Sequence, residues 1–98
     1  MDSSDIAKEL KNFLDDEGRL TKYPAKARLR TLSLFYLASK FEQGKIYTEK
    51  EVNELLKAWH TFGDFATLRR ELYNKYLLGR KADGSEYWLE EEALKLPE

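Results

Sequence analysis

The sequence lacks cysteine altogether and contains a single histidine, His60, in 98 residues. Without cysteine the chain forms neither disulfides nor thiolate metal sites, and one histidine supplies too few ligands for a transition metal. Nucleophilic catalysis needs a Ser, Thr or Cys beside a positioned base, and His60 lies near a predicted helix C-terminus, where a structural or exposed role is expected. A glycine-rich phosphate loop is also missing. We therefore expect no enzyme activity, no catalytic residues, and no cofactor or metal.

Long hydrophobic runs are missing as well. The longest, residues 34–38, is far shorter than the roughly 20 residues of a membrane-spanning helix. The first residues are acidic and amphipathic, unlike a signal peptide. We therefore expect a cytoplasmic protein with no membrane partner.

What the sequence does contain is typical of one soluble folded domain over residues 1–98. Hydrophobic residues make up 42% of the chain, aromatic residues 13% and charged residues 36%. The net charge of −1 is unevenly distributed. An acidic N-terminal segment is followed by residues 19–40, which hold six Lys or Arg and no acid, and the chain closes with an acidic tail at residues 90–98.

The basic segment has two interpretations. It forms a secondary basic patch that meets an acidic partner such as nucleic acid, or it neutralises the acidic segments that flank it in the sequence. The sequence leaves both open. The residues considered for the patch are Arg19, Lys22, Lys26, Arg28 and Arg30.

Two helices are predicted in the first half of the chain. Ile6, Leu10, Phe13 and Leu14 form an apolar stripe at helical spacing, which predicts a helix over about residues 4–16. Residues 25–41 are apolar on nearly all sides of a helical wheel. That pattern is typical of a helix that packs between other elements.

A pair of helices is predicted over about residues 48–76. Thr48 and the glutamate three residues later form a capping box at the start of the first helix, and Trp59 is expected to complete its buried stripe. Asp64 is expected to N-cap the second helix, whose apolar stripe extends to Tyr76. This spacing predicts a helix-turn-helix.

After the helix pair, the periodicity changes to two. The pair Asp83 and Gly84 is preferred in two-residue hairpin turns, because both central positions adopt φ > 0, and it lies within alternating segments over about residues 78–89. Residues 45–47 supply a candidate short strand that pairs with this hairpin. The sequence thus predicts a mainly α fold with a small β-hairpin, an α+β winged helix-turn-helix with an extra N-terminal helix, in the order α-α-β-α-α-β-β.

The predicted function is DNA binding through the helix at residues 64–76 and the wing at residues 78–89. Residues opposite the apolar stripe suit guanine and adenine edges, and cations on the wing suit phosphate. Glu71 and Asp83 lie close in the sequence and oppose phosphate binding. The alternative for these side chains is a solvated face with ordinary charges. The DNA-contact candidates are Thr67, Arg70, Tyr73, Asn74, Arg80 and Lys81.

Arg69 is predicted to have a different role from Arg70. It lies about 55° from the centre of the apolar stripe on a 3.6-residue wheel. We therefore expect its stem to cover apolar surface while its guanidinium pairs with a carboxylate of the preceding helix. Glu51 and Glu54 are the candidate partners.

The competing function is that of a protein-interaction, regulatory or sensing module whose winged-helix fold does not bind DNA. Thirteen aromatic residues are more than one small core is expected to hide, and exposed aromatics anchor interfaces. Tyr23, Tyr73 and Trp88 are expected to be partly exposed. The partner in this case is another protein or a second copy of the chain, although the N-terminal stripe favours packing inside the molecule.

Four separated blocks resemble a bacterial family known as the domain of unknown function 2087. The resemblance implies a winged-helix-like fold in a domain that occurs alone or attached to transcriptional regulators. It implies no catalytic or ligand-binding residues. The blocks are Gly-Arg-Leu at 18–20 with Tyr-Pro-Ala-Lys at 23–26, Tyr-Thr-Glu-Lys-Glu-Val-Asn at 47–53, Leu-Arg-Arg-Glu-Leu at 68–72, and Asp-Gly-Ser-Glu-Tyr-Trp at 83–88.

Overall fold

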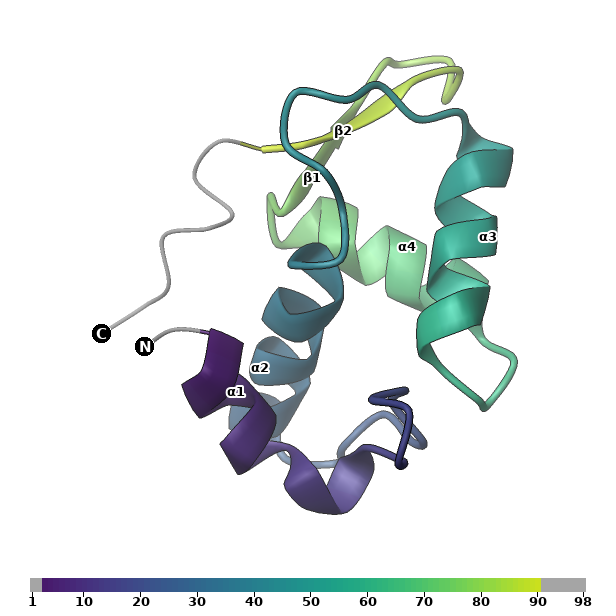
Figure 1. Ribbon diagram of the computed structural model, residues 1–98. Coiled ribbons are helices and arrows are strands. Elements are labelled where there is room, and N and C mark those ends of the chain that lie inside the picture. Colours follow the sequence, from purple (N-terminus) through teal and green to yellow (C-terminus); the bar gives the residue numbers. More distant parts are fainter. Residues whose placement is uncertain (1–2, 91–98) are drawn as a thin grey trace.

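The computed structural model of the chain describes residues 3–90, which form four α-helices, a short 3-10 helix and a two-stranded antiparallel hairpin (Figure 1). The prediction of a mainly helical α+β fold is therefore confirmed. Within residues 3–90, no helix is both long enough and apolar enough to cross a membrane. Apart from Glu90, the predicted acidic tail lies outside the described residues. The elements are α1 (Ser3–Glu9), η1 (Lys11–Phe13), α2 (Ala27–Ala38), α3 (Glu49–Trp59), α4 (Phe65–Asn74), β1 (Leu78–Arg80) and β2 (Tyr87–Leu89).

The N-terminal helix is shorter than the predicted residues 4–16, because α1 ends at Glu9 and only the single turn of η1 follows. Residues 15–19 form a closed loop instead of a further helical turn. The Asp15 carboxylate accepts hydrogen bonds from the backbone N–H groups of Glu17 (3.0 Å) and Arg19 (2.8 Å). Gly18, at φ +78°, donates its N–H to the carbonyl of Asp15 (3.0 Å). These local bonds replace the hydrogen bonds of a continuing helix.

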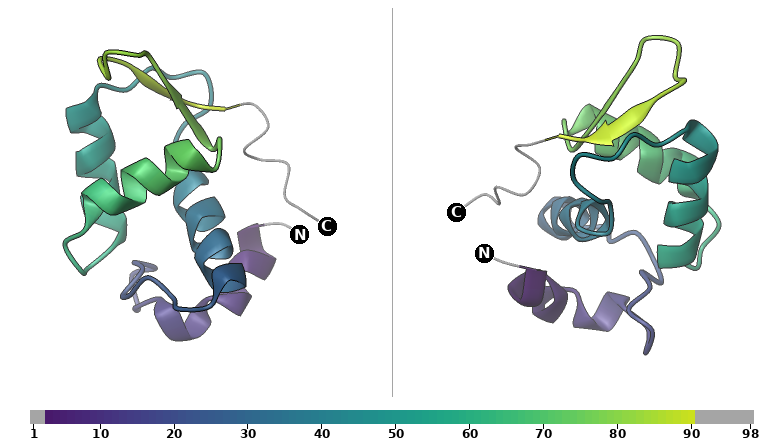
Figure 2. Two further views of the ribbon diagram at one scale, coloured as in Figure 1. Left: turned by 180° about the vertical axis from the view of Figure 1, so that it is seen from behind. Right: turned by 45° about the horizontal axis from the view of Figure 1, so that its top comes forward.

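Helix α2 is buried on opposite sides, as its all-round apolar pattern predicts, although it begins at Ala27 and ends at Ala38. On one side Leu32 and Tyr36 pack with Ile6 and Leu10 of the N-terminal stripe. On the other side Leu34 and Leu37 join the main core with α3, α4 and the hairpin. Figure 2 shows α2 between α1 and α4. The N-terminal stripe is therefore packed inside the molecule.

Helix α3 begins as predicted. The Thr48 side chain accepts from the backbone N–H of Glu51 (3.1 Å), and the Glu51 carboxylate accepts from the backbone N–H of Thr48 (2.8 Å). These bonds lower the pKa of Glu51, with the backbone N–H of Thr48 as the largest cause. Trp59 packs against the main core but is only half-buried, so its predicted burial is confirmed only in part. The Lys40 ammonium lies 4.1 Å from its ring centroid.

The connection between α3 and α4 depends on His60, which is 4% exposed. The backbone N–H of Asp64 donates to Nε2 of His60 (3.0 Å), so the ring proton is on Nδ1, which donates to the carbonyl of Leu56 (2.5 Å). His60 is therefore a structural residue. The predicted N-cap by the Asp64 side chain is wrong, because that side chain makes no capping hydrogen bond.

Helix α4 ends at Asn74, earlier than predicted, and Tyr76 is 82% exposed rather than part of the apolar stripe. Tyr76 has φ +61°, and its N–H donates to the carbonyl of Tyr73 (3.0 Å). The N–H of Leu77 donates to the carbonyl of Leu72 (2.9 Å). This pair of bonds is a Schellman closure, which turns Leu77 into the core in place of Tyr76.

The hairpin lies where predicted, with Leu78, Gly79 and Arg80 paired to Leu89, Trp88 and Tyr87. Its turn differs from the two-residue prediction. Gly84 has φ +75°, but Asp83 does not adopt φ > 0, and the N–H of Gly84 donates to the carbonyl of Lys81 (2.9 Å) across a longer loop.

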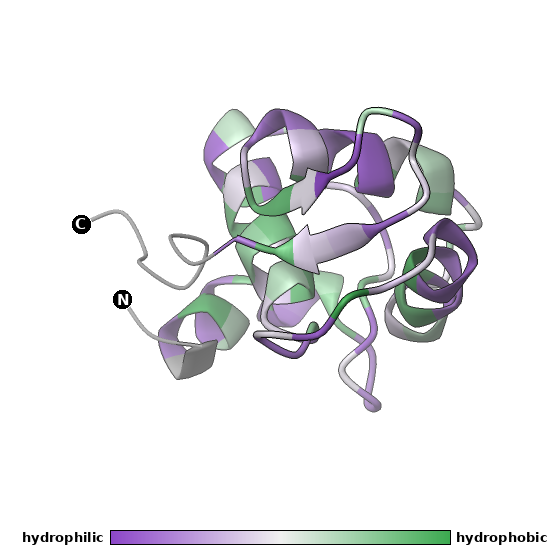
Figure 3. Cartoon of the chain, turned by 90° about the horizontal axis from the view of Figure 1, so that it is seen from above, coloured by the Kyte–Doolittle hydropathy of each residue, from purple (hydrophilic) through white to green (hydrophobic). Residues whose placement is uncertain are grey.

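The strand predicted at residues 45–47 is reduced to one residue pair. Tyr47 and Tyr87 exchange two backbone hydrogen bonds of 2.8 and 2.7 Å in an isolated antiparallel bridge. Seen from above, the loop before α3 runs beside the hairpin, and the helices carry both hydrophobic and hydrophilic positions (Figure 3). The bridge thus fixes the start of α3 against the hairpin.

Candidate functional site

The outward face of α4 carries the predicted side chains. Leu68 and Leu72 are fully buried against the core, which leaves Arg70 and Asn74 exposed on the opposite side. Thr67 is half-buried beside them. The helical phase assigned from the sequence is therefore correct within α4.

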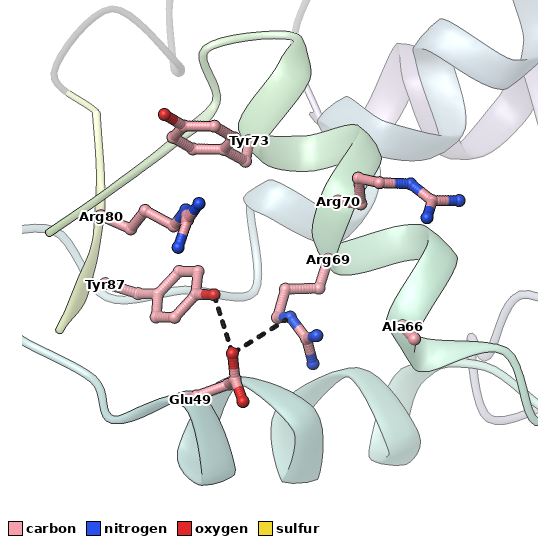
Figure 4. A pocket seen from close by; sticks show the side chains of 7 residues that line it. All are labelled: Glu49, Ala66, Arg69, Arg70, Tyr73, Arg80 and Tyr87. Carbon is pink, nitrogen blue, oxygen red and sulfur yellow. Dashed lines mark hydrogen bonds and ion pairs between the residues drawn. The ribbon is translucent and has the colours of Figure 1, made fainter. Parts of the chain in front are cut away.

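This face borders a pocket of ≈ 260 Å³ enclosed by three elements. The start of α3, the face of α4 and the hairpin each contribute side chains (Figure 4). Three arginines, two tyrosines and one glutamate give it a charged and aromatic lining. The lining residues are Glu49, Ala66, Arg69, Arg70, Tyr73, Arg80 and Tyr87.

Arg69 and Tyr87 meet at Glu49 on one side of the pocket. The Arg69 Nε lies 3.8 Å from Glu49 Oε1, and the hydroxyl of Tyr87 donates to the same oxygen at 3.1 Å. Arg69 also donates from a terminal guanidinium nitrogen to Asn53 Oδ1 (2.5 Å). Burial raises the pKa of Tyr87, and the contact with Glu49 raises it further.

The predicted role of Arg69 is confirmed, but its predicted partners are wrong. Glu51 is engaged in the capping box, and Glu54 lies 3.6 Å from Lys57. The partners are instead Glu49 and Asn53, which are four residues apart and so share one face of α3. Neither partner was singled out from the sequence, because the apolar stripe marks the buried face of α3 but not which edge of that face lies beside Arg69.

Arg80 and Arg70 hold the uncompensated charges of the pocket. The Arg80 guanidinium lies 4.9 Å from the ring centroid of Tyr73, a cation–π contact. Neither guanidinium forms a hydrogen bond or ion pair with another side chain in the described part of the chain. In Figure 4, Arg80 lies between Tyr73 and Tyr87, whereas Arg70 extends away from them.

Lys81, the other predicted cation of the hairpin, is paired. Its Nζ lies 2.9 Å from the Glu86 carboxylate, and this hydrogen bond raises the pKa of Lys81. The hairpin therefore offers one unpaired guanidinium, that of Arg80, and one neutralised ammonium. The structure brings Arg70, Tyr73 and Arg80 together around the pocket and leaves Asn74 on the exposed face outside it.

Two of the six cations in the basic segment at residues 19–40 form ion pairs with carboxylates. Arg19 pairs with Asp15 and Glu17, and Arg28 lies 3.0 Å from Glu9. Arg30 donates to the carbonyl of Ala25 (2.8 Å), and Lys22 lies 6.0 Å from the Phe13 ring centroid. Lys26 is exposed. The pairs with Asp15, Glu17 and Glu9 follow the neutralising interpretation of this segment.

The predicted exposure of aromatic residues is confirmed. Tyr23 and Trp88 are half-buried, and Tyr73 is 41% exposed. Tyr76 is more exposed than any of these three residues, and its exposure was not predicted because the apolar stripe in the sequence placed it in the core. Among residues 3–90, no group of three or more His, Cys, Asp or Glu side chains lies close enough together to hold a metal ion.

The fold and pocket define a small α+β domain in which a helix pair and a hairpin enclose an arginine- and tyrosine-lined site. The chain belongs to the bacterial family described as "Uncharacterized protein conserved in bacteria (DUF2087)", whose model matches residues 19–89. The matched part contains every residue of the pocket and leaves α1 and η1 outside. Neither the curated proteins nor the solved structures provide a match.

Proposed function

We propose that this chain is a winged-helix module that binds double-stranded DNA, with α4 as its recognition helix and the β1–β2 hairpin as its wing. The order of helix pair and hairpin supports this proposal, because a helix-turn-helix presents its second helix to the major groove. The hairpin follows α4 directly and borders the same pocket.

The observation that carries the proposal is the position of Arg70. Its side chain is exposed on the outer face of α4, with no side-chain partner among residues 3–90, and Arg80 of the hairpin borders the same pocket. A free guanidinium on a helix surface is suited to bidentate pairing with guanine or to a phosphate contact.

The test is a fluorescence titration of labelled mixed-sequence duplex DNA at low and moderate salt. Arg70→Ala should weaken binding by roughly 5- to 150-fold if Arg70 reads a base, or lower the salt slope by about one if it contacts phosphate. Arg28→Ala, which removes the same charge on α2, is the control and should bind like the wild type. Absence of salt-dependent binding by the wild-type protein would reject the proposal.

A second candidate is a protein-interaction module, and the exposed tyrosines favour it. Tyr73 and Tyr76 lie at the end of α4, with 41% and 82% of their surfaces exposed. The surrounding charges are of mixed sign, because Glu49 and Glu86 pair with cations there. If this candidate is correct, DNA will not bind, and Tyr76→Ser will abolish association seen by sedimentation equilibrium with a second copy or with a partner.

A further inference from the structure

The pocket between α3, α4 and the hairpin has walls that are held in place by the protein itself. Tyr87 and Arg69 are fixed on Glu49 at 3.1 and 3.8 Å, and Arg80 is stacked against Tyr73 at 4.9 Å. A site whose side chains are already positioned loses little conformational entropy when a ligand binds. The part of the pocket formed by Arg69, Arg80 and Tyr87 is therefore organised before any ligand arrives, whereas Arg70 on the rim is not.

The charges of the pocket do not cancel. Three guanidinium groups line it against one carboxylate, that of Glu49, which Arg69 already pairs. The Arg80 guanidinium has an aromatic ring on one face but no acceptor for its N–H groups among the described side chains. Arg70 on the rim is likewise unpaired. Two positive charges are thus available to a ligand, which suits a dianion better than a monoanion.

We propose that this pocket binds a small phosphate monoester, a role that goes beyond DNA binding and does not depend on it. Guanidinium groups match phosphate oxygens in a bidentate geometry, and a phosphate monoester carries a charge close to −2 above its second pKa of about 6. The ≈ 260 Å³ volume is below the usual range for drug-sized ligands, which suits a small anion.

The residues that line the pocket would contact different parts of such a ligand. Arg80 donates from its free N–H edge while Tyr73 holds its plane. Arg70, which extends away from Tyr73 and Tyr87 in Figure 4, has to rotate inward from the rim to reach the ligand. The Tyr73 ring and Ala66 supply apolar surface for the organic part of the ester. Glu49 contacts no ligand and instead positions Arg69 and Tyr87.

The test is isothermal titration of the whole chain with phenyl phosphate at pH 7.5, without DNA. Phenyl sulfate is the matched ligand, since it has nearly the same shape but a single charge, and inorganic phosphate tests the organic part. We expect phenyl phosphate to bind at least about tenfold more tightly than phenyl sulfate. Arg80→Ala and, separately, Arg70→Ala should each weaken it by about tenfold or more, whereas Arg28→Ala should not.

The two variants protect the test against misfolding, because Arg70 is exposed and its loss leaves the hairpin intact. Equal binding of the two esters, or unchanged binding in both variants, would overturn the phosphate site. Wild-type binding to duplex DNA without any binding of phenyl phosphate at millimolar concentration would overturn this inference and leave the DNA proposal standing. Binding of phenyl phosphate without DNA binding would support the phosphate site and reject the DNA proposal.

Discussion

Two adjacent arginines of α4 lie in opposite environments. The Arg69 side chain is 21% exposed and bound to Glu49 and Asn53 of α3, whereas Arg70 is exposed and unpaired within residues 3–90. A step of one residue turns a helix by about 100°, which moves the side chain from the edge of the core to the solvent. We therefore expect Arg69 to contribute to stability, whereas Arg70 is the residue that we propose contacts a ligand.

Arg69→Ala should destabilise the protein by roughly 1–3 kcal/mol, because it leaves the polar groups of Asn53 and Glu49 without their partner and removes the packing of the stem. Arg70→Ala should change the free energy of unfolding by no more than about 0.5 kcal/mol. Urea denaturation of both variants measures the difference. If Arg70→Ala proved the more destabilising of the two, the contacts assigned to Arg69 would be wrong.

The backbone conformation of Tyr76 determines where its side chain lies. A non-glycine residue at φ +61° is strained, and the Schellman closure at this position normally uses glycine. The strain holds a large aromatic side chain in solvent at the edge of the candidate interface. This cost is understandable if Tyr76 contacts a partner.

Tyr76→Gly should raise the free energy of unfolding by up to about 1 kcal/mol, since relief of strain exceeds the extra flexibility gained by the unfolded chain. Lys75→Gly, one residue earlier at φ −88°, should instead destabilise by about 0.5–1 kcal/mol. Thermal denaturation distinguishes the two. A loss of stability in Tyr76→Gly would contradict the left-handed conformation.

Among the elements, the loop at residues 15–19 explains why the N-terminal helix stops early. Asp15 acts as a local acceptor for backbone N–H groups and for the Arg19 guanidinium, whose Nε lies 2.8 Å from Oδ2. These bonds lower the pKa of Asp15, with the backbone N–H of Arg19 as the largest cause. The loop is thus held by an ionised carboxylate.

This arrangement makes the loop sensitive to acid. The pKa of Asp15 is lower in the folded protein than in the unfolded chain, so its ionised form stabilises the fold at neutral pH, and that contribution is lost as the pH falls from about 4 through the folded-state pKa. Asp15→Asn should therefore lower the Tm at pH 7, and its Tm should converge with that of the wild type once the pH is below the folded-state pKa of Asp15.

The control for acid sensitivity is Asp16→Asn. Asp16 is exposed, and its side chain has no hydrogen-bond partner in the described part of the chain. This variant should match the wild-type Tm at neutral pH. A constant difference between Asp15→Asn and the wild type across the whole pH range would show that Asp15 does not act through its charge.

For the whole molecule, Leu20 joins the N-terminal part to the α3–α4 connection. Its N–H donates to the carbonyl of Trp59 (2.8 Å), and its carbonyl accepts from the N–H of Thr61 (2.9 Å). It also forms an antiparallel bridge with Leu14, and its side chain is fully buried in the main core. Segments about 40 residues apart are thus united at one residue.

Leu20→Ala should cost roughly 2–5 kcal/mol through the lost apolar contacts and the cavity that remains. That is a large part of the roughly 5–15 kcal/mol expected for a protein of this size. Urea unfolding followed by tryptophan fluorescence measures it. Leu55→Ala, at a half-buried position of α3, is the control and should lower the free energy of unfolding by less. A loss of less than about 1 kcal/mol in Leu20→Ala would show that the junction contributes little to stability.

The sequence by itself determined the elements that depend on near neighbours. The capping box at Thr48, the phase of α4 and the hairpin around Gly84 follow from residues within a few positions of one another. The all-round apolar pattern of α2 likewise predicted a helix covered on two sides. Helical and strand periodicity can be recognised within a single segment, without knowledge of the rest of the fold.

The tertiary structure alone decided how these elements meet. The packing of α3 against α4 places Glu49 and Asn53, rather than Glu51 or Glu54, beside Arg69. The Tyr47–Tyr87 bridge holds the start of α3 against the hairpin, where the Tyr87 hydroxyl lies 3.1 Å from Glu49, 38 residues away. Ion pairs with Asp15, Glu17 and Glu9 likewise divide the basic segment. No periodicity encodes these contacts, because they depend on the packing of several elements at once.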